Sequence, residues 1–300
     1  MAEIEIRLLK TYDEMPAAVE LQHTYWGKHE ESVIPAHMLY SIATNGGHVL
    51  AAFDEERLVG LLVGFIGTTD DEKRPAMANL HVVSKRMVVL SEYRSRNIGY
   101  RLKLAQRDRA IQQGIRMVTW TFDPLMALNA HLNVRKLGGM CAHYLQDYYG
   151  TRDEGGLVSL GSSDRLLVEW WVTNRRVEER LFGSRNDLTL MQYLQANTTI
   201  INPTTLTNDG ILLPTGTLQM PDTAFALVEI PLHYPAIIQN NSDLAMKWRL
   251  HSREVFQTAF ERGYMVTDFL REQYEGRERA FYLFSYNGPS VESDSSFTLN

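Results

Sequence analysis

The stretch that decides the fold is Val88–Leu102, which reads VVLSEYRSRNIGYRL. An apolar strand pattern runs into a polar turn, and the turn opens a helix, Asn97–Gln113, that ends at Gly114. Successive backbone N–H groups of such a turn, together with the first unpaired N–H groups of the helix, form an anion site. The sequence therefore predicts an anionic ligand at this turn.

The charge of this region agrees with that prediction. Between Arg94 and Arg116 there are seven basic residues and one acid, in a chain whose net charge is −6. A polyphosphate ligand explains the concentration, and a solvated arginine-rich helix face is the alternative. The basic residues are Arg94, Arg96, Arg101, Lys103, Arg107, Arg109 and Arg116, and the acid is Asp108.

Apolar periodicity predicts the order β-α-α-β-β-β-α-β-α-β-β over the first 175 residues. Leu58–Ile66 is apolar on both faces and is expected at the centre of the sheet. The expected strands are Glu3–Leu9, His48–Phe53, Leu58–Ile66, Asn79–Leu90, Ile115–Phe122, Met140–Tyr149 and Arg165–Val172, and the expected helices are Thr11–Trp26, Pro35–Thr44, Asn97–Gln113 and Pro124–Leu137.

The second half of the chain has a different character. A short helix is expected at Arg175–Phe182, and Asn197–Thr223 is interpreted as a linker or edge-strand region. A smaller β-α-β-β half follows, made of Ala224–Ile230, Ser242–Arg262, Tyr264–Arg271 and Ala280–Tyr286. We expect an α/β (α+β) protein with a domain at 1–175, a C-terminal half at 176–290 and a disordered tail at 291–300.

Composition excludes several classes of protein. The longest apolar run, Leu58–Ile66, has nine residues, whereas a membrane span needs roughly 20. The first residues lack the pattern of a secretory signal, and the single Cys141 excludes internal disulfides and cysteine zinc clusters. The nine histidines include no i, i+4 pair, so no metal site is expected. We expect a cytoplasmic protein that binds neither membranes nor nucleic acid.

The sequence resembles the GNAT acyltransferase superfamily, whose acyl-CoA signature is Arg/Gln-x-x-Gly-x-Gly/Ala after the fourth strand. Arg94–Gly99 matches at Arg94 and Gly99 and has Asn97 at the first glycine, and asparagine tolerates a positive φ well. Asn129–Gly138 resembles the later helix of the family, which commonly ends Lys-Leu-Gly. Trp120–Leu125 with Asn129-Ala130 resembles a bacterial subgroup with a long C-terminal extension, some members of which transfer succinyl groups to amino acids.

The resemblance implies a GNAT-like, mostly antiparallel mixed sheet flanked by helices, with acetyl-CoA or another acyl-CoA as co-substrate. The strand end would pair with the pantetheine arm, the turn would hold the pyrophosphate, and Arg101 or Lys103 would reach the adenosine end. Asn129 or Asn133 would face the pantetheine or the thioester. The implied cofactor-binding residues are Val88, Val89, Leu90, Arg94, Ser95, Arg96, Asn97, Ile98, Gly99, Tyr100, Asn129 and Asn133.

The implied reaction is direct attack of a primary amine, such as that of an amino acid, on the thioester. It needs a base, an oxyanion donor and an acid for the thiolate. Glu92 and Asp123 are the candidate bases and His81 is a third, although a surface acid, a helix N-cap and a structural strand histidine are the alternatives.

The acid departs from the family pattern. Val134 stands where many members place a tyrosine. Tyr144, Tyr148, Tyr149 and water are the candidate substitutes, and nothing in the spacing chooses among them. Tyr144 is named as the candidate catalytic residue, and we expect one of the three Tyr→Phe variants to lower kcat with little change in acyl-CoA affinity.

Other functions stay open at this point. The loss of the tyrosine is also compatible with a non-catalytic acyl-CoA-binding module, and the Arg94–Arg116 helix with a nucleic-acid binder. The second half is expected to be a degenerate GNAT-like or capping half that does not bind CoA. We expect a homo-oligomer.

Overall fold

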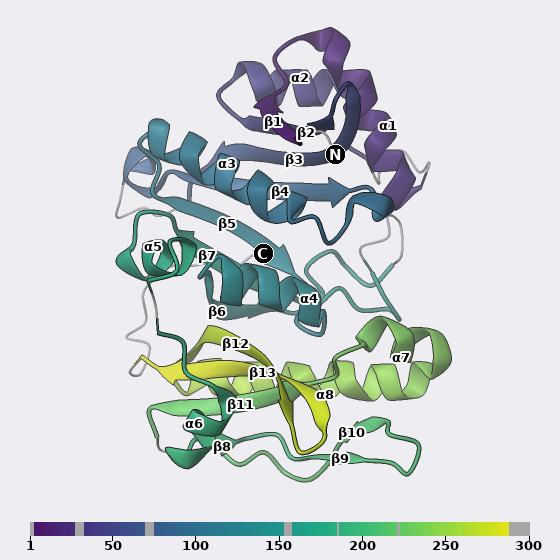
Figure 1. Ribbon diagram of the computed structural model, residues 1–300, viewed down its shortest axis with the longest axis vertical. Helices are drawn as coiled ribbons and strands as arrows, with labels where there is room; N and C mark the ends of the chain where they lie inside the picture. Colours follow the sequence, from purple (N-terminus) through teal and green to yellow (C-terminus); the bar gives the residue numbers. More distant parts are fainter. Residues whose placement is uncertain are drawn as a thin grey trace.

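A computed structural model describes residues 3–27, 33–69, 75–152, 158–184, 186–220 and 223–287. Its main feature is one mixed sheet of 11 strands in the order β1-β2-β3-β4-β5-β7-β6-β12-β13-β11-β8 (Figure 1). Helices flank the sheet, so the prediction of a mixed, mostly antiparallel α/β fold is confirmed.

The first half of the chain follows the predicted element order, with boundaries shifted by a few residues. The strands are β1 Glu5–Leu8, β2 His48–Asp54, β3 Arg57–Gly67, β4 His81–Val89, β5 Met117–Phe122, β6 Met140–Leu145 and β7 Arg165–Trp171. The helices are η1 Tyr12–Glu14, α1 Met15–Trp26, α2 Ala36–Thr44, η3 Ala76–Asn79, η4 Ser91–Tyr93, α3 Ile98–Gln112, α4 Ala127–Ala130, the π-helix η5 His131–Lys136, and α5 Arg175–Leu181.

One predicted helix has a different form. Pro124–Leu137 was expected as a single α-helix, but it is the short α4 followed by the wider turn η5. The Leu137 N–H donates to Leu132 O, five residues back. Gly139 then packs so closely that a Cβ there would lie 2.5 Å from Val168 Cγ1 and 2.9 Å from Asn133 O. The adjoining helix therefore ends where the backbone is pressed against β7.

The second half contains two helices that the sequence analysis missed, α6 and α7. The elements are α6 Leu190–Gln195, β8 Thr199–Ile200, β9 Thr204–Leu206, β10 Leu212–Pro214, β11 Phe225–Ile230, α7 Tyr234–Asn240, α8 Ser242–Glu261, β12 Tyr264–Tyr274 and β13 Arg277–Tyr286. β13 lies between β11 and β12, whereas β4 and β5 of the first half are direct neighbours. The tail 291–300, predicted to be disordered, lies outside the described residues.

The two halves share one core. Trp170, Val168 and Phe122 of the first half belong to the same buried cluster as Trp248 and Phe256 of α8. β6 meets β12 through the antiparallel pair Cys141–Val266, so the sheet continues across the predicted boundary near residue 175. The division into two domains therefore stays a prediction.

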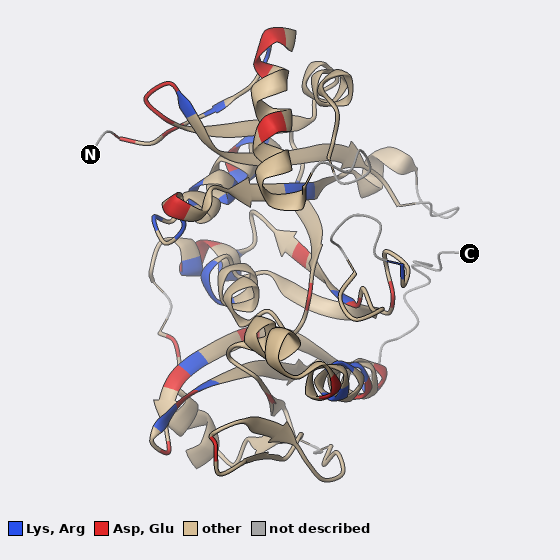
Figure 2. Cartoon of the chain, turned by 90° about the vertical axis from the view of Figure 1, so that its right-hand side faces the viewer, with Lys and Arg blue, Asp and Glu red and all other residues tan. Residues whose placement is uncertain are grey.

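Buried ion pairs also join the halves. Asp123 pairs with Arg249, Asp164 with Arg253, and Asp268 of β12 with Arg135. Figure 2 shows acidic and basic positions side by side along α8, the helix that supplies Arg249 and Arg253. No helix in the described part of the chain is long and apolar enough to cross a membrane.

Candidate functional site

The most distinctive feature of the sheet is a fork between β4 and β5. β4 pairs with β3 along its whole length, but it pairs with β5 only at Val82–Val118 and Val83–Thr119. A β-bulge accompanies the separation, because Gly64 opposes Ser84 while Val63 opposes Arg86, which leaves Lys85 as the extra residue. Beyond the fork, the β4 edge that faces β5 is not paired with it.

The turn after β4 forms the second part of the site, here called the cradle, Arg94–Tyr100. Ser95 has φ +68° and Asn97 has φ +57°, so asparagine adopts the left-handed conformation that was expected at this position. Within the described residues, no backbone N–H from Ser95 to Tyr100 has an intramolecular acceptor. The first turn of α3 carries no acid. The cradle therefore offers free donors and a helix N-terminus to an anion.

A hollow of about 410 Å³ lies beside the cradle, between the start of α3 and η5. Lys136 Nζ lies 2.9 Å from Asn97 Oδ1 and 5.5 Å from the Tyr100 ring centre. Burial and the neighbouring Lys136 and Arg135 lower the pKa of His131 in the same hollow. Glu179 and Asp187 line the same hollow and Arg135 pairs with Asp187, so Lys136 is the basic residue that the hollow offers beside the cradle.

The structure places most of the predicted cofactor-binding residues in one continuous segment and the two asparagines apart from it. Val88–Leu90 and the cradle are continuous along the chain, while Asn129 is exposed on α4 and Asn133 is buried in η5. A Cβ at Gly99 would lie 3.3 Å from Met87 Cε of β4. The glycine thus allows α3 to approach the strand closely.

Arg101 and Lys103 were expected to reach the adenosine end of the ligand, but both make contacts within the protein instead. Arg101 donates to Ile4 O, and Lys103 is buried against the sheet. Arg107 is also buried and donates to Val172 O. These three basic residues of α3 therefore stabilise the packing of the helix, and they form neither a phosphate site nor a solvated helix face.

Each candidate catalytic residue is already engaged by other protein groups. Glu92 is exposed and pairs with Arg57 at 2.7 Å, and hydrogen bonds from its own backbone N–H and from Arg57 lower its pKa. Asp123 accepts both Arg249 nitrogens, at 2.9 and 2.5 Å, and also the Leu125 N–H. The alternative role of Asp123 as a helix N-cap is wrong, because Met126 is the N-cap of α4 and the Asp123 carboxylate instead accepts the Leu125 N–H of the preceding turn.

The remaining two candidates are engaged as well. Tyr144 donates its hydroxyl proton to Asp164 at 2.6 Å, and burial, reinforced by that carboxylate, raises its pKa. His81 is buried at the start of β4 with Nδ1 3.1 Å from Asn79 O.

Two other side chains lie at the fork itself. The Tyr149 hydroxyl is 3.3 Å from Thr121 Oγ1 of β5, and Lys85 Nζ of β4 lies 4.8 Å from the Tyr149 ring centre. On the α3 side, Lys103 Nζ contacts Ser84 and Trp120, the first residues past the last β4–β5 pair. The helical stripe Gly99, Lys103, Gln106 and Ala110 was the sequence signal that could have placed Lys103 against the sheet.

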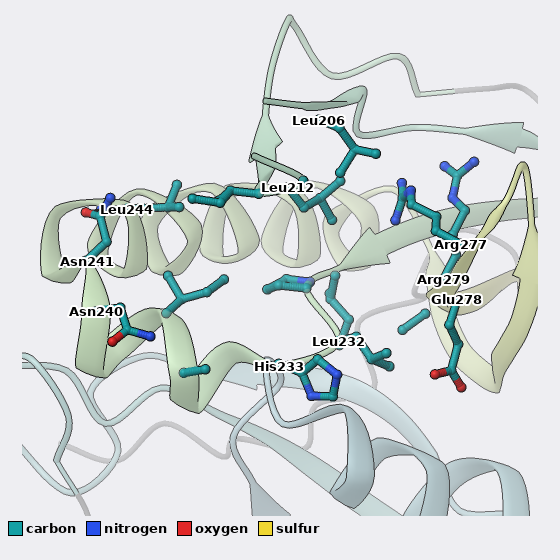
Figure 3. Close-up of a pocket in the computed structure, with 17 residues that line it drawn as sticks. Leu206, Leu212, Leu232, His233, Asn240, Asn241, Leu244, Arg277, Glu278 and Arg279 are labelled. Carbon is teal, nitrogen blue, oxygen red and sulfur yellow. The ribbon is translucent and has the colours of Figure 1, made fainter. Parts of the chain in front are cut away.

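A separate pocket of about 350 Å³ lies in the C-terminal half, between the β9–β10 hairpin, the start of α8 and β13 (Figure 3). Leu206, Leu212 and Leu232 contribute to its mostly apolar lining. Its arginines, Arg277 and Arg279, both pair with the buried Glu229. Among the residues that the structure describes, the pocket thus has no unpaired arginine for a phosphate.

The fold and the site define a class: an α/β protein with an anion cradle at the end of a strand that separates from its neighbour. Residues 15–134 match the Acetyltransferase (GNAT) family. Residues 15–134 therefore form a GNAT-family domain, which a long C-terminal region follows, and members of this family use acetyl-CoA as co-substrate.

Several solved structures are similar to this chain at 14% sequence identity. The ribosomal-protein-S18-alanine N-acetyltransferase of Escherichia coli matches with a TM-score of 0.43, over 57% of this chain and 96% of its own. A GNAT-family acetyltransferase of Streptococcus pneumoniae matches with a TM-score of 0.42, over 56% and 98%. An N-acetyltransferase of Staphylococcus aureus Mu50 matches with a TM-score of 0.43, over 57% and 100%. No curated relative matches the sequence.

Proposed function

We propose that the protein transfers an acetyl group from acetyl-CoA to the primary amine of a small molecule by direct attack in a ternary complex. The observation that carries this proposal is the continuity of the free β4 edge with the cradle. One extended ligand with an anionic end fits both features. Coenzyme A has that form, since a pyrophosphate is followed by a pantetheine arm with two amides.

The proposed binding mode follows from the donors. The free N–H groups of Ser95–Tyr100 hold the pyrophosphate, and Lys136, at the rim of the neighbouring hollow, contributes a positive charge to the nucleotide end. The pantetheine amides pair with Val88–Leu90 as an added strand would. The six residue steps from Leu90 back to Ser84 span about 20 Å at about 3.3 Å per residue, so an arm of that order ends at the fork.

The acceptor amine then approaches from the face of the sheet that α3 does not cover. Trp26 of α1 lies on that face, where the Arg86 guanidinium stacks at 4.4 Å from its ring centre. Tyr149 closes the same side of the fork through Thr121. An amino acid or a similar small amine is the acceptor that we propose, and the same proposal includes self-association into a homo-oligomer.

The test is calorimetric binding of acetyl-CoA and of CoA, followed by thiol release against a panel of primary amines. Arg94→Glu reverses a charge in the exposed cradle, and we expect it to weaken binding about 10- to 100-fold, the equivalent of one charge-assisted hydrogen bond. The matched control is Arg175→Glu, an equal change at an exposed position of α5.

The outcomes separate the candidate functions. If Arg94→Glu, Arg175→Glu and the unmodified protein bind acetyl-CoA with equal affinity, the cradle is not part of the binding site. Binding of acetyl-CoA without amine-dependent thiol release across the panel would favour a non-catalytic acyl-CoA-binding module. The buried Val134, at the position where many family members have a tyrosine, is the reason for this alternative.

A further inference from the structure

Lys103 is a buried lysine with no carboxylate partner among the described residues. Its side chain is 2% exposed, and its Nζ lies 2.8 Å from Ser84 Oγ, 3.3 Å from Gln106 Oε1 and 3.5 Å from the Trp120 ring centre. A charged lysine is almost never fully buried unless it is paired. The sheet and α3 therefore maintain an unusual and costly arrangement at this point.

The three contacts suit an ammonium group. A hydroxyl oxygen, an amide oxygen and an indole face can each take one of its three N–H groups. Burial acts in the opposite direction and lowers the pKa of Lys103 well below its usual value. The three contacts thus support the ammonium form while burial opposes it, so the group is placed to give its proton to a thiolate beside it.

The position of Lys103 matches the end of the proposed cofactor arm. Ser84 and Trp120 are the first residues past the last β4–β5 pair, so Nζ lies at the point where the two strands separate. If coenzyme A lies along the free β4 edge, its sulfur end reaches this point. Two of the three candidate tyrosines are less suited, since Tyr144 already donates to Asp164 and Tyr148 is exposed. Tyr149, which lies at the fork 3.3 Å from Thr121 Oγ1, is the competing candidate.

We propose that Lys103 is the general acid that protonates the coenzyme A thiolate, in place of the tyrosine that Val134 replaces. The inference rests on the proposed function. The amine forms the C–N bond, the C–S bond breaks with its electron pair on sulfur, and the sulfur takes a proton from Nζ. The nitrogen of the new amide loses one proton to solvent, and solvent returns one to Lys103, so the products are the amide and the free thiol.

The test uses Lys103→Met, which keeps the length of the side chain and removes the amine. Replacing a buried charge by an apolar group of similar volume is often neutral for folding, and circular dichroism checks this. We expect kcat to fall about 100-fold at unchanged acetyl-CoA affinity, the usual contribution of a general acid. The control is Lys247→Met, at an exposed position of α8, with no effect expected.

A second readout does not need the acceptor. We titrate the thiol of bound CoA by its thiolate absorbance, because a nearby ammonium favours the thiolate. In the unmodified protein we expect a pKa at least one unit below that of free CoA, and in Lys103→Met a return to the free value. A bound thiol with the same pKa in both proteins would overturn the proposal while leaving CoA binding intact. The proposal would also be overturned if Tyr149→Phe lowered kcat about 100-fold while Lys103→Met left kcat unchanged.

Discussion

The ion pair between Asp123 and Arg249 gives a sharp test of what Asp123 does. The pair joins the end of β5 to α8, with side-chain exposures of 18% and 2%. Asp123→Asn keeps an oxygen for the Leu125 N–H and removes only the negative charge. The Arg249 guanidinium is then left buried without its counter-charge.

The expected loss of stability is large. Although burial opposes the charged form, Asp123 raises the pKa of Arg249, so the two charges stabilise each other. Two unit charges about 4 Å apart interact by about 4 kcal/mol at an effective dielectric constant of about 20. Removing one partner of a buried pair costs about 3–5 kcal/mol. Because whole domains are stable by only about 5–15 kcal/mol, Asp123→Asn should remove a substantial part of the total.

The assay is urea unfolding followed by tryptophan fluorescence. Asp147→Asn is the matched control, since Arg253 keeps its 2.9 Å contact with Asp164 when Asp147, at 3.4 Å, loses its charge. We expect that control to lose about 1 kcal/mol or less. An Asp123→Asn protein of unchanged stability whose kcat falls strongly would refute the structural role and restore Asp123 as the catalytic base.

A chain that ends at Asn174 should be insoluble, because it exposes the face of Cys141, Tyr144 and Phe122 that packs on α8 and β12; a monomeric, active product in size-exclusion chromatography would contradict this. Gly99→Glu should abolish acetyl-CoA binding in calorimetry, because its side chain enters the contact between α3 and Met87 of β4 and displaces the cradle; unchanged affinity of a variant that circular dichroism shows to be folded would count against the cradle. Burial lowers the pKa values of His48, His131 and His251, so the folded state binds fewer protons than the unfolded chain. The free energy of unfolding should therefore fall as pH drops below about 6.5, by up to about 1.4 kcal/mol per pH unit for each histidine, and His48→Gln should reduce that slope; an unchanged slope would be evidence against it.

Local signals explain how much of the fold could be predicted from the sequence. The apolar strand, the polar turn and Gly114 mark β4, the cradle and the end of α3 within one short stretch. α6 and α7 also had local signals that were overlooked: Thr189 and Gln192 form a capping box, and Pro235 stands in the first turn of α7, where proline is favoured.

Features set by tertiary contacts were beyond reach. The segment after the π-helix packs at Gly139 against Val168, which is far away in the sequence, so no local pattern indicated this contact. Arg249 and Asp123 meet across 126 positions, so no local pattern could show that the candidate base was engaged. Lys103 was expected to reach the adenosine end of the ligand, and only the packing of α3 on the fork reveals its burial.

The continuous sheet has a consequence for how copies of this protein can meet. An uncovered strand edge is a template for pairing with another chain. Here β12 pairs with β6, so that edge is closed within the chain, and apart from the fork between β4 and β5 the sheet ends at β1 and β8. These terminal strands have four and two residues, which offers few backbone groups to a second sheet. The C-terminal half thus protects the acetyltransferase domain against edge-to-edge association, and oligomers would form through helix or side-chain surfaces.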